Sequence, residues 1–319
     1  MTGSGFDPAV FEDSAIDEET RAINARIDKV FENAPPIDTV PPQVMRDARA
    51  RGEGVFAARP KTERAVVRDI EGPGGPVGLR IVAPAAPRGV YLHFHGGGWV
   101  NGANDQNDPL LLHFADRLGL AVVSVNYRLA PENPYPAAPD DCEAAARWLV
   151  ANARSEFGTD WLAIGGESAG AHLAAVTLLR MRDRHGYNGF EAANLVFGVF
   201  DMALTPSVRN WGPRRLVLNT HSIAWFRDVF APDPATWASP DVSPIQGDLR
   251  GLPPALFTCG TLDPLLDDTL FMHARWMAAG NHAQIELFPG GAHGFSSFGG
   301  PLAKRFTARV DRFLEERLG

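Results

Sequence analysis

The pentapeptide at residues 166–170 reads Gly-Glu-Ser-Ala-Gly and lies between an apolar run at 161–164 and a stretch of helical length that begins at Ala169. A G-x-S-x-G sequence between a strand and a helix is typical of a nucleophile elbow, a sharp turn that exposes the serine hydroxyl. The N-terminus of the helix favours the negative charge that develops when a serine attacks a carbonyl carbon. Ser168 is therefore the predicted nucleophile of an acyl-transfer reaction.

A second motif, His-Gly-Gly-Gly-Trp at residues 95–99, follows a β-like run at 90–94. Successive glycines let backbone N–H groups point into a site without side-chain obstruction, which suits the stabilisation of an oxyanion. The N–H groups of Gly97, Gly98 and Ala169 are the predicted oxyanion hole. A glycine-rich loop can also hold phosphate, but the Lys-Ser/Thr pair of a P-loop does not follow these glycines.

Nine histidines compete for the role of general base. His293 lies in the glycine-containing stretch 289–295, where a loop after the last β-like run can carry the imidazole to the carboxyl edge of a sheet. His95 is expected to support the glycine loop, and His172 to pack within the helix after Ser168. The remaining histidines are expected in helices or in the inserted region, as ordinary surface or core residues: His93, His113, His185, His221, His273 and His282.

A carboxylate that orients the base is expected between Ser168 and His293 in the sequence, because scaffolds with a serine elbow order their triad Ser, Asp or Glu, His. Asp263 follows the apolar run 255–259 and fits this place, whereas Asp267, the next candidate, already belongs to the following helical stretch. Asp263 would hold the imidazole in one tautomer and stabilise the imidazolium.

These candidates need a scaffold, and the sequence alternates between two periodicities. The β-like runs are 65–70, 77–82, 90–94, 121–127, 161–164, 193–200, 255–259 and 285–288. The stretches of helical length are 107–118, 140–153, 169–184, 265–279 and 302–318. Such alternation predicts an α/β fold in which a mostly parallel sheet is covered by helices on both faces.

Two segments stand outside the alternation. Residues 204–251 hold several prolines and aromatic residues and are interpreted as the inserted part of a helical cap, with residues 1–50 as its N-terminal part. Residues 51–203 and 252–319 then form the catalytic domain. The aromatic side chains of the insertion either cover the carboxyl edge of the sheet, where open α/β sheets bind ligands, or form a small satellite core.

Composition narrows the class of partner. The 319 residues carry a formal net charge of -8, which gives no reason to expect nucleic acid, and a small neutral substrate fits better. The two cysteines form neither a disulfide framework nor a zinc pattern, so they give no reason to expect a structural zinc. The acidic first thirty residues lack the order of a secretory signal, and no run approaches the ~20 apolar residues of a membrane span. A cytoplasmic location without stable membrane insertion is expected.

Taken together, the motifs resemble the hormone-sensitive-lipase-like family of α/β-hydrolases, which includes the family IV esterases of bacteria. Beyond the two glycine motifs the resemblance rests on Asn-Tyr-Arg-Leu-Ala-Pro-Glu at 126–132, Tyr-Pro-Ala-Ala-Pro-Asp-Asp at 135–141, Asp-Pro-Leu at 263–265 and His-Gly-Phe at 293–295. It departs at Glu167, where the family often has aspartate, and at Ala171, where a further glycine is common.

The resemblance implies an eight-stranded sheet, a helical cap, and hydrolysis of short- to medium-chain carboxylic esters through an acyl-enzyme on Ser168, without a cofactor. Trp99 and Phe295 would shape the substrate pocket, and since family members often dimerise, a homodimer is an expectation. Two other functions use the same triad: an arylformamidase-like amide hydrolase and an acetyl-esterase. A non-catalytic small-molecule receptor is the remote alternative, and the presence of His293 argues against it.

Overall fold

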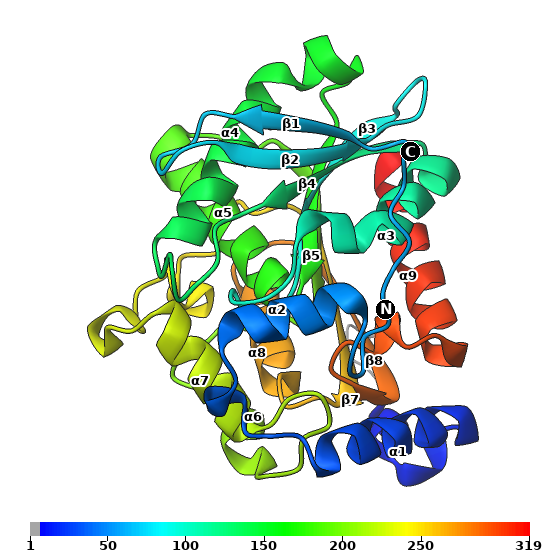
Figure 1. Ribbon diagram of the computed structural model, residues 1–319. Coiled ribbons are helices and arrows are strands. Elements are labelled where there is room, and N and C mark those ends of the chain that lie inside the picture. Colours follow the sequence, from blue (N-terminus) through cyan, green and yellow to red (C-terminus); the bar gives the residue numbers. More distant parts are fainter. Residues whose placement is uncertain (1–6) are drawn as a thin grey trace.

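The computed structural model describes residues 7–319, which form one mixed sheet of eight strands in the order β1-β2-β4-β3-β5-β6-β7-β8 (Figure 1). The strands are β1 Val66–Ile70, β2 Val77–Val82, β3 Gly89–Phe94, β4 Leu120–Asn126, β5 Leu162–Glu167, β6 Phe190–Val196, β7 Ala255–Leu262 and β8 Ala283–Ala292. Only β2 runs against its neighbours β1 and β4, and every pairing from β4 to β8 is parallel. The predicted mostly parallel sheet is confirmed.

Helices cover the two faces of this sheet (Figure 1). They are α1 Glu18–Glu32, α2 Pro42–Arg51, α3 Asp108–His113, α4 Ala137–Phe157, α5 Ala169–His185, α6 Pro206–Trp211, α7 Thr220–Phe230, α8 Leu266–Ala278 and α9 Gly300–Leu318. One apolar core joins α4, α5 and α8 to the sheet, and a second joins α3 and α9 to it.

Alternation along the strands divides the side chains between these two cores. On β4, Val123 and Val125 belong to the core with α4 and α5, whereas Leu120 and Val122 belong to the core with α3 and α9. Successive residues of a strand point to opposite faces, so a run of apolar residues buries both. Full burial of each such side chain contributes about 1.5–3 kcal/mol to stability. Because both faces of these strands are buried, their sequences are continuous apolar runs.

Several predicted boundaries were wrong at their ends. The run predicted at 193–200 begins at Phe190 and ends at Val196, because Phe197 takes a φ of 35° and turns the chain away. The glycine stretch predicted as a loop from residue 289 instead continues β8 as far as Ala292. These shifts leave the predicted order of elements unchanged.

The N-terminal segment and the insertion contact each other. In Figure 1, α1, α2, α6 and α7 lie together on the lower side of the molecule. Arg214 of the insertion forms an ion pair with Asp28 at 2.8 Å, and the guanidinium of Arg215 lies 4.4 Å from the centre of the Phe31 ring. We refer to residues 18–51 and 204–230 together as the roof region. Residues 1–6 of the expected N-terminal cap segment lie outside the described residues.

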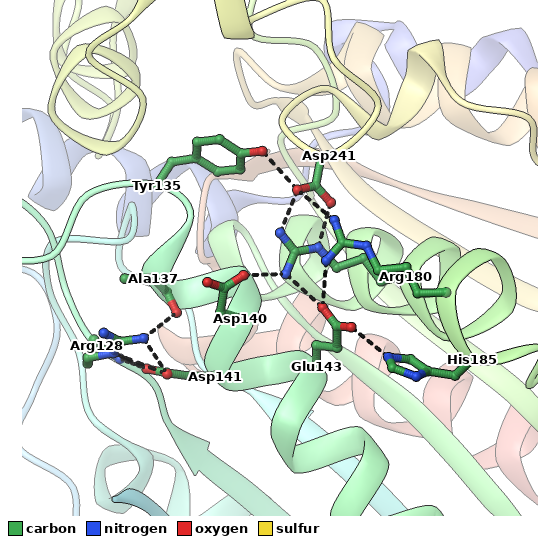
Figure 2. A network of polar contacts seen from close by, with 10 residues as sticks. Arg128, Tyr135, Ala137, Asp140, Asp141, Glu143, Arg180, His185 and Asp241 are labelled. Atoms are coloured by element: carbon green, nitrogen blue, oxygen red, sulfur yellow. Dashed lines mark hydrogen bonds and ion pairs between the residues drawn. The ribbon is translucent and has the colours of Figure 1, made fainter. Parts of the chain in front are cut away.

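A buried ion network ties the insertion to the helices beneath it (Figure 2). The side chain of Arg180, on α5, is only 3% exposed and forms ion pairs with Asp140 and Glu143 of α4 and with Asp241. Tyr135 also donates a hydrogen bond to Asp241 at 2.8 Å. Burial raises the pKa of Asp241, but the hydrogen bonds and charge of Arg180 outweigh it and hold that pKa below its usual value.

Replacing Arg180 by Met is expected to lower the free energy of unfolding by about 3–5 kcal/mol at pH 7, because three carboxylates lose their buried partner. Carboxylates with a lowered folded-state pKa stabilise the fold above their unfolded pKa, near 4, and lose that contribution as the pH falls. The difference between wild type and variant should therefore shrink below about pH 4. Urea denaturation across that range measures it.

The matched control is Arg184→Met. Arg184 contacts the same Glu143 and Asp241, but its side chain is 47% exposed. Exposed ion pairs contribute at most about 1 kcal/mol, so this variant should be nearly as stable as the wild type. Equal effects of the two substitutions would contradict the assignment of the stabilisation to the buried guanidinium.

Candidate active site

Three side chains from three strand ends meet at the carboxyl edge of the sheet. The hydroxyl of Ser168, between β5 and α5, donates to Nε2 of His293 at 3.0 Å. Nδ1 of His293, which follows β8, donates to Oδ2 of Asp263, which follows β7, at 2.9 Å. All three residues are buried, with 9%, 6% and 1% of their surface exposed for serine, histidine and aspartate. The structure thus brings the predicted triad together in the geometry of a nucleophile, a base and an orienting carboxylate.

The elbow depends on a close approach between two strands and a helix. Ser168 has φ 56° and ψ -119°, a conformation that residues with a side chain rarely adopt. Its N–H donates to the carbonyl of Val196 on the neighbouring strand, which holds the turn. A Cβ on Gly170 would lie 1.9 Å from the carbonyl oxygen of Phe94, so only glycine lets α5 begin so close to β3.

The glycine loop lies against the same turn. Gly97 has φ 133°, and a Cβ at this position would lie 2.1 Å from the carbonyl oxygen of Asn101. The Gly97 carbonyl accepts hydrogen bonds from the N–H groups of Val100 and Asn101, which fixes the loop. Gly97 and Gly98 line the cavity that contains Ser168. Ala169 is the first residue of α5, so its N–H has no acceptor within the helix.

Trp99 is tied to the nucleophile helix by a hydrogen bond that the sequence did not suggest. Its indole N–H donates to Nδ1 of His172 at 3.2 Å, and Nε2 of His172 donates to the carbonyl of Val242 in the insertion at 2.9 Å. Burial lowers the pKa of His172 to about 4, so the ring stays neutral and can accept. His172 was expected only to pack in its helix. Its spacing of four residues from Ser168, on one helix face, is the signal that points to the site.

Replacing His172 by Ala is expected to lower kcat about ten-fold with little change in KM, because Trp99 and the adjoining glycine loop lose one buried hydrogen bond. His172→Gln keeps both a donor and an acceptor and should recover most of the rate. Steady-state kinetics on p-nitrophenyl butyrate measures both variants.

His273→Gln serves as the control for that substitution. His273 is also buried, but it lies on α8 and is not among the residues that line the cavity. It should leave kcat unchanged. An unchanged kcat in His172→Ala would show that Trp99 needs no such support.

Phe295 does not occupy the expected place. It packs against the rings of Phe197, Phe288 and Phe306 in the core beneath α9, with centroid distances of 4.7–5.9 Å. It is not among the cavity-lining residues, whereas Trp99 is. The expectation that Phe295 shapes the pocket is therefore corrected: after the left-handed turn at Gly294, Phe295 begins a short 3-10 helix and its ring packs into the core.

The aspartates that follow Asp263 are engaged elsewhere. Asp267 accepts a hydrogen bond from the N–H of Ser207 at the start of α6. Asp268 accepts from the N–H of Phe200 at 2.7 Å and from the hydroxyl of Thr205 at 2.6 Å. Both carboxylates anchor the entry to the insertion, which leaves Asp263 as the carboxylate that reaches His293.

Two further histidines lie on or directly after β3. The hydroxyl of Tyr127 donates to the carbonyl of His95 at 2.6 Å, and the two rings stack 4.2 Å apart. Burial lowers the pKa of His95 to about 3, which suits a structural role. His93 was expected in a helix or in the insertion but lies on β3, where its ring contacts Ser124 at 2.8 Å and Glu167 at 3.2 Å.

A cavity of about 640 Å³ opens above the triad. Its floor holds the glycine loop, Ser168 and His293, and its walls come mainly from the roof region and residues 53–59. Apolar side chains of the roof include Leu218, Ile223 and Phe226. A largely apolar pocket of this size with a few polar groups at its base suits a small organic substrate.

Other chemistries find less support in residues 7–319. Within this range, no group of three His, Cys, Asp or Glu side chains is arranged to hold a metal ion. None of the helices there is both long and apolar enough to cross a membrane. Cys142 and Cys259 are buried free thiols, and burial raises the pKa of each well above its usual value.

A parallel sheet that places a serine elbow, an aspartate and a histidine in this order defines an α/β-hydrolase. The family described as alpha/beta hydrolase fold matches residues 91–297. The esterase LipI of Mycobacterium tuberculosis is 35% identical over 77% of this chain and 80% of its own length. The ethyl acetate hydrolase of Pseudomonas putida is 33% identical over 68% of this chain and 69% of its own length.

Solved structures agree with these relatives. A hyperthermophilic esterase from the archaeon Pyrobaculum calidifontis superposes with a TM-score of 0.83 at 28% identity, covering 94% of this chain and 98% of that one. The chain belongs to the hormone-sensitive-lipase-like family of α/β-hydrolases, and it is a carboxylic-ester hydrolase.

Proposed function

We propose that the protein hydrolyses short- to medium-chain carboxylic esters through an acyl-enzyme on Ser168. The observation that carries the proposal is the hydrogen-bonded chain from Ser168 through His293 to Asp263, which opens into a cavity of about 640 Å³. The names of the relatives, which include an ethyl acetate hydrolase and an acetyl esterase from Salmonella, support small ester substrates.

The first half of the reaction forms the acyl-enzyme. Ser168 attacks the ester carbonyl carbon while Nε2 of His293 takes the hydroxyl proton, and Asp263 stabilises the imidazolium that results. The carbonyl oxygen becomes an oxyanion, which the N–H groups of Gly97, Gly98 and Ala169 stabilise. The tetrahedral intermediate then collapses, the carbon–oxygen bond to the alcohol breaks, and His293 gives its proton to the departing alkoxide.

The second half repeats these steps with water. His293 takes a proton from a water molecule, which attacks the acyl carbonyl, and the same N–H groups stabilise the second oxyanion. Collapse breaks the bond to Ser168, and His293 returns a proton to the serine oxygen. The net reaction is ester and water to acid and alcohol, so this chemistry needs neither a metal nor an organic cofactor.

The roof region is part of this proposal. Residues 1–50 and 204–251 act as the two halves of a cap that excludes bulk water from the acyl-enzyme and limits the size of the substrate, and the roof region supplies the part that lines the cavity. Their mutual ion pair between Arg214 and Asp28, and the side chains that both halves contribute to the cavity wall, support this role.

Hydrolysis of p-nitrophenyl acetate, butyrate, octanoate and palmitate tests the proposal. We expect kcat/KM to be highest for acetate or butyrate and lowest for palmitate. Ser168→Ala should lower kcat by about 10⁴- to 10⁶-fold, because the members of a triad act as a unit. An organophosphate should add covalently to Ser168 in the wild type, as detected by mass spectrometry.

The same panel, extended by an N-formyl anilide, separates the alternatives. An arylformamidase-like enzyme would hydrolyse an N-formyl anilide faster than any ester, and an acetyl-esterase would act on the acetate alone. A receptor would show neither turnover nor covalent label in folded protein, and this outcome would overturn the assignment of the triad.

Location and assembly are further parts of the proposal. Two free, buried thiols are typical of proteins in a reducing compartment, which supports the cytoplasm. A homodimer is proposed by resemblance to the family. Cell fractionation and light scattering test the two statements separately.

A further inference from the structure

Two arginines reach the cavity above Ser168 from one short stretch of chain. Arg49 lies on α2, Arg59 lies in the segment that follows it, and both side chains line the cavity. The proposed esterase reaction uses neither of them. Cations in a largely apolar wall are costly unless something compensates them, so their surroundings indicate what they bind.

Arg49 has no carboxylate partner among the described residues. Its Nε donates to the amide oxygen of Gln106 at 3.0 Å, and its guanidinium carbon lies 4.8 Å from the centre of the Phe56 ring. Both are neutral groups. Burial and the nearby charge of Arg59 lower the pKa of Arg49, so its surroundings disfavour the positive charge that it carries.

The other charges around these arginines do not neutralise both. Lys61 is paired with Asp105. Two further carboxylates line the cavity: Glu53, which is paired with Arg51 at 2.6 Å, and Glu167, whose oxygens contact Nε2 of His93 at 3.2 and 3.3 Å. Each is already engaged by another side chain, so Arg49 and Arg59 leave an excess of positive charge at the cavity.

This excess lies beside the reacting groups. Glu167 immediately precedes Ser168. Burial raises the pKa of Glu167, but the charge and hydrogen bond of His93, with the charge of Arg59, outweigh it and lower that pKa. On the other side, the ring of Phe56 packs against Gly294, where a Cβ would lie 3.0 Å from it, and Gly294 follows His293. A negative group held by the two arginines would therefore occupy the same cavity as the scissile ester.

We propose that Arg49 and Arg59 form an anion subsite that binds a carboxylate on the substrate, so that the preferred esters carry a negative charge in addition to the ester group. The inference rests on the proposed esterase function and specifies its substrate class. A guanidinium offers a planar fork of N–H donors that matches a carboxylate, and the apolar wall reduces the competition from water. The carboxylate can belong to the acyl part or to the alcohol part of the ester.

The test compares charged esters with uncharged esters of the same shape. Monoethyl glutarate carries its carboxylate on the acyl side, and 4-acetoxybutyrate carries it on the alcohol side. Ethyl valerate and butyl acetate are the respective uncharged controls. For the wild type we expect kcat/KM to be higher for at least one charged ester than for its control by roughly ten-fold, the effect of about 1.4 kcal/mol. The ester that shows the preference identifies the side that carries the charge.

Three variants locate the effect. Arg59→Gln and Arg49→Gln should remove the preference for the charged ester while changing the uncharged ester by less than about two-fold. Arg59→Lys, which keeps the charge, should retain most of it. Arg64→Gln is the matched control, because Arg64 is exposed and paired with Asp116 outside the cavity. Added salt should weaken the preference in every protein that shows it, which means the wild type, Arg59→Lys and Arg64→Gln.

The outcomes distinguish a failure of the anion subsite from a failure of the proposed esterase function. Equal losses for charged and uncharged esters in Arg59→Gln would mean that Arg59 only compensates Glu167, and would overturn the subsite. The absence of any preference for either charged ester in the wild type would overturn it as well. Failure to hydrolyse the uncharged esters and to take up the organophosphate would instead overturn the esterase function.

Discussion

The strained turn at Ser168 is the constraint on which the rest of the site depends. A serine at φ 56° is stable only because the chain on both sides is fixed: its N–H bonds to β6, and α5 starts against the end of β3. Because the turn lies between parallel strands, the glycine loop after β3 and His293 after β8 reach the hydroxyl from opposite sides. A small displacement of α5 would therefore disturb both Ser168 and the proposed oxyanion hole.

Helix α5 transmits this constraint outward. Near the start of α5, His172 connects the indole of Trp99 to the carbonyl of Val242. Near the end of α5, Arg180 forms an ion pair with Asp241, the residue before Val242. The same helix thus begins directly after Ser168 and fixes the inserted segment at two adjacent residues. The buried ion network around Arg180 lies outside the active site, and it determines where the end of the insertion meets the catalytic domain.

Sequence reasoning reached the parts of the molecule that local rules control. Short contiguous motifs predict the elbow, the glycine loop and the order of Ser168, Asp263 and His293. The alternation of strands and helices predicts the sheet. It did not reach contacts made across the fold, such as the hydrogen bond from Trp99 to His172. It misplaced Phe295, because an aromatic residue near a catalytic loop suits a pocket and a core equally well until the direction of the side chain is known.

The floor and the roof of the cavity differ in how their residues are held in place. The floor is built from buried strand ends, whereas the roof comes from two segments distant in sequence, joined by contacts that include the exposed ion pair of Arg214 and Asp28. Such pairs contribute little to stability. Substitutions at such exposed positions of the roof can therefore accumulate at low cost to folding, while substitutions in the buried floor cannot. For a lineage of such enzymes, this division lets selection change which molecules enter while the machinery that cleaves them is inherited intact.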